Sequence, residues 1–356
     1  MKRLSIVVGA VAMSLAACSS NGDDGTAGPA GPAGPAGAPG SPGAAGPAGA
    51  GGATGTKTAS EDVASLQLPG PAFYPQAITS AADGAIFVSS IGTGEIVKFA
   101  AGSLRPTVIV PKADPQILTP GLVVDTDTLW ACTVRFAAPS FQQPIAELRS
   151  YDLTGKLVKA YPLPNQGSSM CEEPTVGPNR RIYVTDAFRG EIYVLDSPGA
   201  SLRSWVASES LRPTDPNVLP FGAHGIAWDG GGNVFVANFN ASRLVRIPIG
   251  ASGAAGIPSD VVVSPALVQP EALRMLDAKT FVLTQSAGNP SNAQLTKIAL
   301  TGDNTAAAVP LRTGLKWATA VTRARGSFWI AEGQIDHFLD GSKPQLPFQV
   351  ERLDAE

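Results

Sequence analysis

Charge and histidine are both scarce in this sequence. Only 15% of its 356 residues are charged, the formal net charge is −3, and no basic stripe is present. This composition gives no indication of nucleic-acid binding. The chain has two histidines and no G-x-S-x-G, C-x-x-C or H-E-x-x-H motif. It therefore lacks the common sequence patterns of serine hydrolases, thiol–disulfide enzymes and zinc peptidases.

Cysteine is also rare, and the first of the three cysteines has the most informative position. Lys2 and Arg3 precede an apolar run at 4–17, which is too short to span a membrane as a helix but fits the hydrophobic region of a signal peptide. The run ends in Leu-Ala-Ala before Cys18, and this resembles a bacterial lipobox. We therefore expect residues 1–17 to be a lipoprotein signal peptide and Cys18 to be acylated. An ordinary signal peptide is the alternative.

The residue after the lipobox cysteine bears on localisation. Ser19 is small and neutral, and in lipoproteins such a residue usually implies sorting to the outer membrane. The several acyl chains of a lipoprotein anchor firmly, whereas one chain anchors weakly. We predict a protein held in the bacterial outer membrane by the lipid at Cys18 and facing the periplasm or the outside.

Glycine and proline are concentrated in one segment. Glycine recurs at every third position from Gly22 to Gly55, and four of the twelve triplets are Gly-Pro-Ala. This is the repeat of a collagen triple helix, in which only glycine fits at the axis. The strict period and the lack of a preceding strand exclude a phosphate-binding loop. Residues 18–57 are thus predicted to be a stalk, either as a homotrimer through a triple helix or as a monomeric polyproline II segment.

From residue 58 onward one pattern is written six times. Each copy combines an apolar strand, a Gly/Asp/Asn turn, a strand rich in β-branched and aromatic residues and a third, alternating strand. The copies begin near Tyr74, Pro120, Glu173, Ala223, Pro270 and Trp317. A period of roughly 40–50 residues built from short strands is typical of a β-propeller. We predict an all-β fold in which 58–356 form a six-bladed propeller, closed when 63–68 pairs with the last blade.

Several motifs, taken in order, resemble one propeller family. They include CEEPTVGPNRRIYVTDA at 171–187, FGAHGIAWDGGGNVFVAN at 221–238 and TAVTRARGSFWIAEG at 319–333. Over about residues 62–353 the chain resembles the senescence marker protein / gluconolactonase / luciferin-regenerating enzyme family. The resemblance implies a six-bladed propeller. It also implies the activity of that family's enzymes, which hydrolyse sugar lactones with one divalent metal on the axis.

In that family four polar residues line the axis, each at the start of an innermost strand. By motif position, Gln76 takes the place of a Glu, Glu172 and His224 take the places of Asn, and Glu271 takes the place of an Asp. The resemblance thus implies a metal set of these four residues, with Glu271 as the catalytic carboxylate. None of the four identities matches the family, although all four are polar. The set could hold Zn, Mn or Ca with an open position for water, or could be a metal-free polar plug satisfied by waters.

The other two cysteines fall in adjacent copies of the repeat. Cys132 ends the second strand of copy two, and Cys171 directly precedes Glu172. After export both face an oxidising compartment, which favours a disulfide that would hold the Glu172 loop in place. Two buried thiols are the alternative.

The sequence leaves two main functions open. The first is an envelope-anchored binding or scaffold module with a small-molecule ligand at the propeller axis, favoured by the four altered axial residues. The second is a metal-dependent hydrolase of sugar lactones or related esters, favoured by the polarity of all four. A third is an adhesive or structural trimer that acts through its stalk. A propeller fold by itself decides among none of these.

Overall fold

The computed structural model of the chain describes residues 63–355, apart from 114–116, 138–141, 215–219 and 287–291. The predicted signal peptide, the lipidation site at Cys18 and the collagen-like stalk lie outside the described residues and stay predictions. Within the described ranges, no helix is long and apolar enough to cross a membrane.

Three sheets are meanders of four consecutive antiparallel strands. The first contains β2 (Pro75–Ser80), β3 (Ile86–Ser90), β4 (Ile96–Phe99) and β5 (Thr107–Val110). The second contains β6 (Leu122–Asp125), β7 (Thr128–Ala137), β8 (Gln142–Asp152) and β9 (Leu157–Pro162). The third contains β10 (Cys171–Val176), β11 (Ile182–Asp186), β12 (Glu191–Leu195) and β13 (Arg203–Ala207), with short 3₁₀ turns at Pro178–Arg180 and Glu209–Leu211.

The fourth sheet has eight strands. One half contains β14 (Ala223–Trp228), β15 (Asn233–Asn238), β16 (Arg243–Pro248) and β17 (Ser259–Ser264). The other half contains β18 (Pro270–Met275), β19 (Thr280–Gln285), β20 (Ala293–Gly302) and β21 (Thr305–Leu315). Each half is antiparallel internally, and the halves join where the outer strands β17 and β21 run parallel over three residue pairs. The sheet is therefore two four-stranded meanders linked at their rims.

The fifth sheet contains both ends of the described chain. It orders β22 (Ala318–Ala324), β23 (Ser327–Glu332), β24 (Gln349–Asp354) and finally β1 (Ser65–Gln67). Leu66 in β1 stands opposite Val350 in β24. This pairing confirms that residues 63–68 close the ring against the last blade, so the sheet gains its outer strand from the other end of the sequence.

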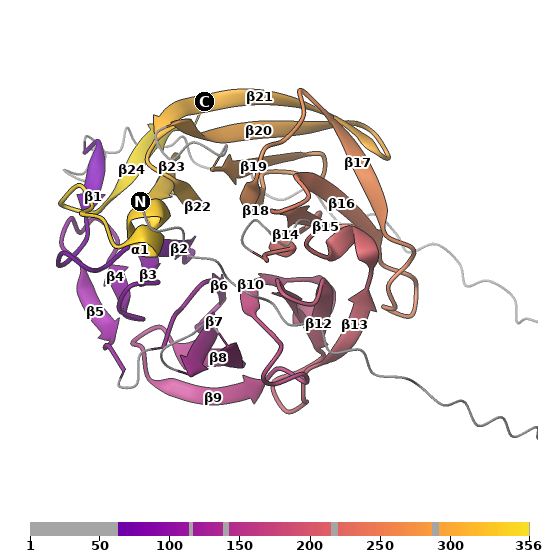
Figure 1. The fold of residues 1–356 in the computed structure, drawn as a ribbon, viewed down its shortest axis with the longest axis horizontal. Coiled ribbons are helices and arrows are strands. Elements are labelled where there is room, and N and C mark those ends of the chain that lie inside the picture. The colour runs from indigo at the N-terminus through magenta and orange to yellow at the C-terminus, as the bar shows by residue number, and fades with distance from the viewer. Residues whose placement is uncertain (1–62, 114–116, 138–141, 215–219, 287–291, 356) are drawn as a thin grey trace, which may run out of the picture. The chain divides into compact units, whose positions relative to one another are not determined.

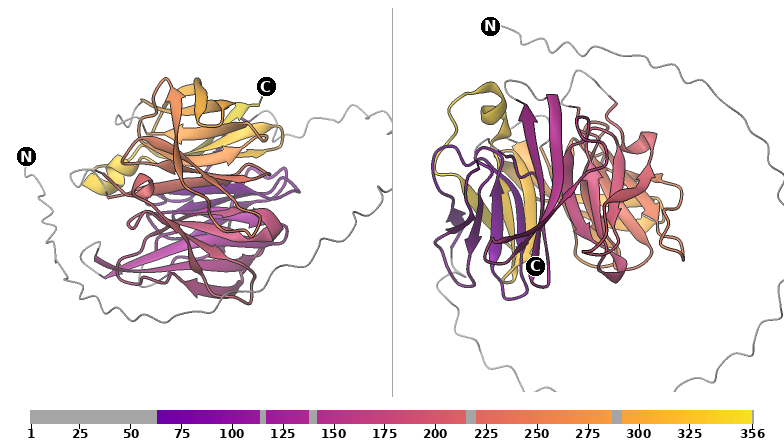
Figure 2. Two further views of the ribbon diagram at one scale, coloured as in Figure 1. Left: turned by 90° about the vertical axis from the view of Figure 1, so that its right-hand side faces the viewer. Right: turned by 90° about the horizontal axis from the view of Figure 1, so that it is seen from below.

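The sheets surround a central axis, as in a β-propeller (Figure 1). The first strand of each four-stranded unit lies nearest the axis, and each such inner strand contacts the inner strands of its two neighbours around the ring. Helix α1 (Ile335–Asp340) follows β23 and projects from one face of the ring in both side views (Figure 2). Because β22 and β23 are antiparallel, this is the face at which the inner strands begin.

The core lies between neighbouring sheets. One cluster packs Ile78 and Val88 of the first sheet against Trp329 and Val350 of the last, all at most 1% exposed. Strands with apolar residues on both faces need cover on both sides, and a closed ring supplies it. The predicted all-β propeller class is confirmed, with α1 as a short addition.

Candidate functional site

Each of the four predicted site residues lies in its own β-bulge at the start of an inner strand. Gln76, Glu172, His224 and Glu271 lie in β2, β10, β14 and β18. The pairing register shifts around them, between Pro75 and Ile78, Cys171 and Pro174, Ala223 and Ile226, and Pro270 and Leu273. Bulges re-aim side chains and are common beside active sites. The repeat thus places one redirected polar side chain from each of these strands at the same level of the ring.

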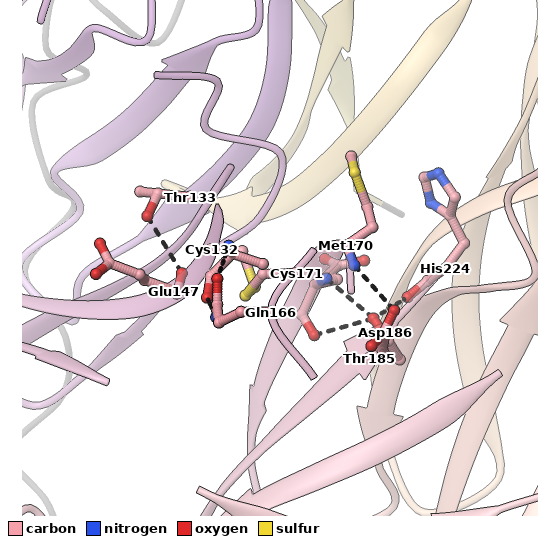
Figure 3. Close-up of a disulfide and its surroundings, with 11 residues drawn as sticks. Cys132, Thr133, Glu147, Gln166, Met170, Cys171, Thr185, Asp186 and His224 are labelled. Carbon is pink, nitrogen blue, oxygen red and sulfur yellow. Dashed lines mark hydrogen bonds between the residues drawn. A yellow bond between two sulfur atoms is a disulfide. The ribbon is translucent and has the colours of Figure 1, made fainter. Parts of the chain in front are cut away.

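Threonine hydroxyl groups on the second strands form hydrogen bonds to the next inner strand. The Thr185 hydroxyl accepts the backbone N–H of Glu173 at 3.0 Å and donates to the carbonyl of His224 at 2.8 Å (Figure 3). Thr284 donates to the carbonyl of Thr319 in the same way at 3.2 Å. These bonds are buried and link neighbouring units, so the bulges are held at fixed positions around the axis.

Three of the predicted residues line one small cavity. Gln76, Glu172 and His224 are 8%, 3% and 7% exposed, and with Glu173 they border a space of about 10 Å³. That is roughly the least volume that holds one water molecule. Glu271 directly precedes another lining residue, and its carboxylate is close enough to raise the pKa of Glu172. The structure therefore brings all four residues to one place on the axis.

Glu172 and His224 form a buried pair across two inner strands. Oε1 of Glu172 lies 3.3 Å from Nε2 of His224. Burial raises the pKa of Glu172 well above its usual value, and the carboxylates of Glu173 and Glu271 raise it further. Burial lowers the pKa of His224 to about 3. Both shifts disfavour the charged forms, so burial opposes an ion pair between these two side chains.

Glu271 has a described partner for only one carboxylate oxygen. Its Oε1 accepts the indole N–H of Trp317 at 2.6 Å, whereas Oε2 is buried with no hydrogen-bond partner among the described residues. Burial raises the pKa of Glu271 to about 8; the Trp317 hydrogen bond opposes this rise and the charge of Glu173 adds to it. Trp317 has a left-handed backbone with φ of 49°. Sequence reasoning missed its role, because the repeat marks Trp317 only as the start of a copy.

Arg274 and Glu173 form an ion pair that links two different inner strands. One guanidinium nitrogen of Arg274 pairs with Oε1 of Glu173 and also donates to the Leu273 carbonyl at 2.9 Å. The other terminal nitrogen donates to the carbonyl of Ile78 at 3.3 Å. Burial raises the pKa of Glu173, and Arg274 opposes that rise. Arg274 therefore joins strands β2, β10 and β18, a strut that the family motifs did not signal.

The disulfide prediction is confirmed. Cys132 and Cys171 are bonded, with their Cα atoms 5.2 Å apart, and both are fully buried (Figure 3). Cys132 belongs to β7 and Cys171 is the first residue of β10, directly before Glu172. The bond therefore anchors one end of the bulge that carries Glu172 to the preceding sheet.

The described residues do not form a ready metal site. In the described part of the chain, no group of three or more His, Cys, Asp or Glu side chains is arranged to hold a metal ion. Nε2 of His224 faces the carboxyl group of Glu172. Structural zinc needs about four ligands and calcium six to eight. As arranged, the four predicted residues do not fit a divalent cation.

A larger hollow lies away from the axis on the second sheet. It measures about 170 Å³ and is bordered by Thr133, Arg135, Ile145, Glu147 and Arg149, among others. The guanidinium of Arg149 already pairs with Glu147 at 2.7 Å. This hollow could admit a small ligand, whereas the axial cavity as it stands has room for about one water.

Comparison with known proteins identifies the fold class. A streptogramin B lyase structure is similar with a TM-score of 0.52 and 17% identity, covering 82% of this chain and 97% of that one. The calcium-binding protein regucalcin from Agrobacterium tumefaciens gives 0.55 and 14%, covering 82% and 95%. A protein provisionally named a gluconolactonase gives 0.54 and 12%, covering 81% and 91%.

No protein-family model matches the chain, and no curated protein matches it. The structural likenesses share 17% identity or less with this chain, so they establish the propeller fold and not an activity. The chain is a β-propeller of the kind seen in regucalcin and in streptogramin B lyase.

Proposed function

We propose that this protein is a lipid-anchored β-propeller of the bacterial cell envelope that serves as a binding or scaffold module with a metal-free polar axial site. The observation that carries the proposal is the axial cavity. Gln76, Glu172 and His224 border a space of about 10 Å³, which is too small for a lactone ring.

The anchoring part of the proposal comes from the N-terminal sequence. The Leu-Ala-Ala-Cys motif supports acylation of Cys18, and Ser19 supports sorting to the outer membrane. The Gly-X-Y repeat within 18–57 supports a spacer between lipid and propeller, formed by one chain or by three. The propeller would then face the periplasm or the cell exterior.

We propose six blades. The support is the four four-stranded sheets together with the two linked meanders of the eight-stranded sheet. This count agrees with the six sequence copies and with the resemblance to the senescence marker protein / gluconolactonase family. We therefore place the chain beside that family as a member with an altered axis.

The second candidate is a metal-dependent hydrolase of lactones or related esters. Its support is the fold likeness to regucalcin and to the provisionally named gluconolactonase, together with the convergence of Gln76, Glu172, His224 and Glu271. For this function His224 would have to turn away from Glu172, so that its nitrogen and the carboxylates could share a cation.

Metal content and turnover separate the two candidates. The purified full chain is assayed for bound metal, and then incubated with a panel of sugar and simple lactones in Ca²⁺, Mn²⁺ or Zn²⁺. The binding-module proposal predicts no stoichiometric metal and no turnover above the metal-only blank. Turnover that disappears in Glu271→Gln, but not in the surface control Glu209→Gln, would establish the hydrolase instead.

A further inference from the structure

Two buried oxygens at the axis accept no hydrogen bond from any described residue. They are Oε1 of Gln76 and Oε2 of Glu271. Gln76 lines the axial cavity and is only 8% exposed. Because an unpaired buried acceptor is costly, a water or a bound hydrogen-bond donor would stabilise these oxygens.

The carboxyl groups in and beside the axial cavity outnumber the basic side chains that could balance their charge. Glu172 and Glu173 line the cavity, and Glu271 lies beside them. Arg274 pairs with Glu173, and His224 is neutral because burial lowers its pKa to about 3. If all three carboxyl groups ionise, three negative charges against one guanidinium leave two uncompensated.

We propose that the axial cavity binds an ammonium group, as the free ion or as the head of a primary amine, held by oxygens of Gln76, Glu172 and Glu271. The inference rests on the proposed role of the propeller as a binding module and names its class of ligand. An ammonium group is about the size of the one water that the cavity admits. It donates hydrogen bonds, accepts none and carries the missing charge.

Water, a divalent cation and potassium each explain fewer of these observations than an ammonium group does. Water can donate hydrogen bonds to these oxygens but brings no positive charge to the three carboxyl groups. A divalent cation needs a larger set of ligands than the described residues bring together. Potassium supplies charge without donors, so it has no directional preference for the oxygens of Gln76 and Glu271.

Thermal unfolding of the purified full chain tests the proposal. Equal ionic strengths of ammonium, methylammonium, potassium, sodium and tetramethylammonium chloride are compared at one pH. We expect ammonium to raise Tm by about 2–4 °C at saturation relative to sodium. Glu172→Gln and Gln76→Leu should each reduce this rise, whereas the exposed control Glu209→Gln should keep it. Two variants are used so that one folding failure does not remove the test.

The separate salts distinguish the sources of the ligand. A rise with ammonium alone indicates the free ion, and a rise shared by methylammonium indicates the head of an amine. Equal rises with potassium or tetramethylammonium, or no ammonium-specific rise, overturn the inference. Stabilisation by Ca²⁺, Mn²⁺ or Zn²⁺ that is lost in Glu172→Gln overturns it in favour of a metal site.

The outcome is separable from that of the proposed function. Lactone turnover by the same preparation contradicts the binding-module proposal whatever the ammonium result. A missing ammonium effect without turnover removes only the choice of ligand and leaves the binding module in place.

Discussion

His224 Nε2 lies 3.3 Å from Glu172 Oε1, although the two residues come from different inner strands. The same Thr185 hydroxyl that accepts the N–H of Glu173 donates to the carbonyl of His224. The backbone on both sides of the pair is therefore held by one side chain. The pair therefore has a fixed position on the axis, and burial disfavours the charged form of each member.

The first prediction concerns alkaline pH. Burial raises the folded-state pKa of Glu271 to about 8 from a usual 4.5. The protonated form thus contributes stability that is present below about pH 4.5 and is lost as pH rises through 8. In Glu271→Gln this loss is absent, so its free energy of unfolding should fall less than that of the wild type between pH 6.5 and 9. Denaturant unfolding at a series of pH values measures it.

His224 sets the lower pH limit of this comparison, which runs from pH 6.5 to 9. Its pKa is lowered to about 3, so its contribution is present above about pH 6.5 and is lost as pH falls toward 3. Above pH 6.5 the slope of the unfolding free energy against pH therefore reports the ionisation of the carboxyl groups. Parallel slopes for the wild type and Glu271→Gln between pH 6.5 and 9 would show that Glu271 is already ionised at neutral pH.

The second prediction concerns the strut across the axis. Arg274→Met leaves Glu173, which is 5% exposed, without its cation. Removing one partner of a buried pair typically costs about 3–5 kcal/mol of unfolding free energy. Adding Glu173→Gln to Arg274→Met should restore part of this loss, because the double variant buries no unpaired charge. The measurement is a double-mutant cycle in urea.

A surface pair provides the matched control for Arg274. Arg203 binds Asp196 at 2.7 Å, and the arginine side chain is 51% exposed. Arg203→Met should cost no more than about 1 kcal/mol. If Arg274→Met lowered the unfolding free energy by no more than Arg203→Met, the contacts of Arg274 with three inner strands would not stabilise the propeller.

The third prediction concerns the disulfide. Cys132 and Cys171 enclose a sequence separation of 39 residues, and the paired Cys→Ser variant should lose about 2–4 kcal/mol. Peptide mapping without reductant should recover the linked peptides. Alkylation of both cysteines in the denatured, unreduced protein would show that the bond does not form in cells.

The fourth prediction concerns the anchor. If Cys18 is acylated, the wild type fractionates with membranes, and Cys18→Ala is released to the soluble fraction or accumulates unprocessed. Metabolic labelling with a fatty-acid analogue followed by fractionation measures both effects. Identical maturation and fractionation of the two proteins would leave an ordinary signal peptide as the explanation.

Repetition made much of the fold predictable. Alternating strands and turn residues recur through the six copies, and the alternating segment at 63–68 had no partner in its own copy. Its pairing with β24 follows because a ring must cover its last edge. The parallel contact of β17 with β21 could not be foreseen, because it joins outer strands whose exposed residues carry no periodic signal.

The axial site was predictable in position and not in chemistry. The start of each inner strand converges on the axis in any closed ring, so Gln76 and Glu271 could be placed without a structure. In a regular strand Glu173 would point away from the face used by Glu172. The bulge brings both to the cavity, and Arg274 then supplies charge from 101 residues away.

The last prediction concerns the close approach of two inner strands beside the cavity. A Cβ atom on Gly121 would lie 2.1 Å from the carbonyl oxygen of Glu172 and 2.7 Å from the Cα of Glu173. Because these are backbone atoms, Gly121→Ala can be accommodated only by moving the bulge, at a cost of about 1–3 kcal/mol. Gly232→Ala, whose Cβ would meet nothing within 4 Å, is the matched control and should be nearly neutral. Denaturant unfolding of both variants gives the comparison. A ligand-induced shift in Tm that weakens only in Gly121→Ala would show that the backbone of the bulge positions Glu172, whereas equal stability of the two variants would show that the bulge can move freely.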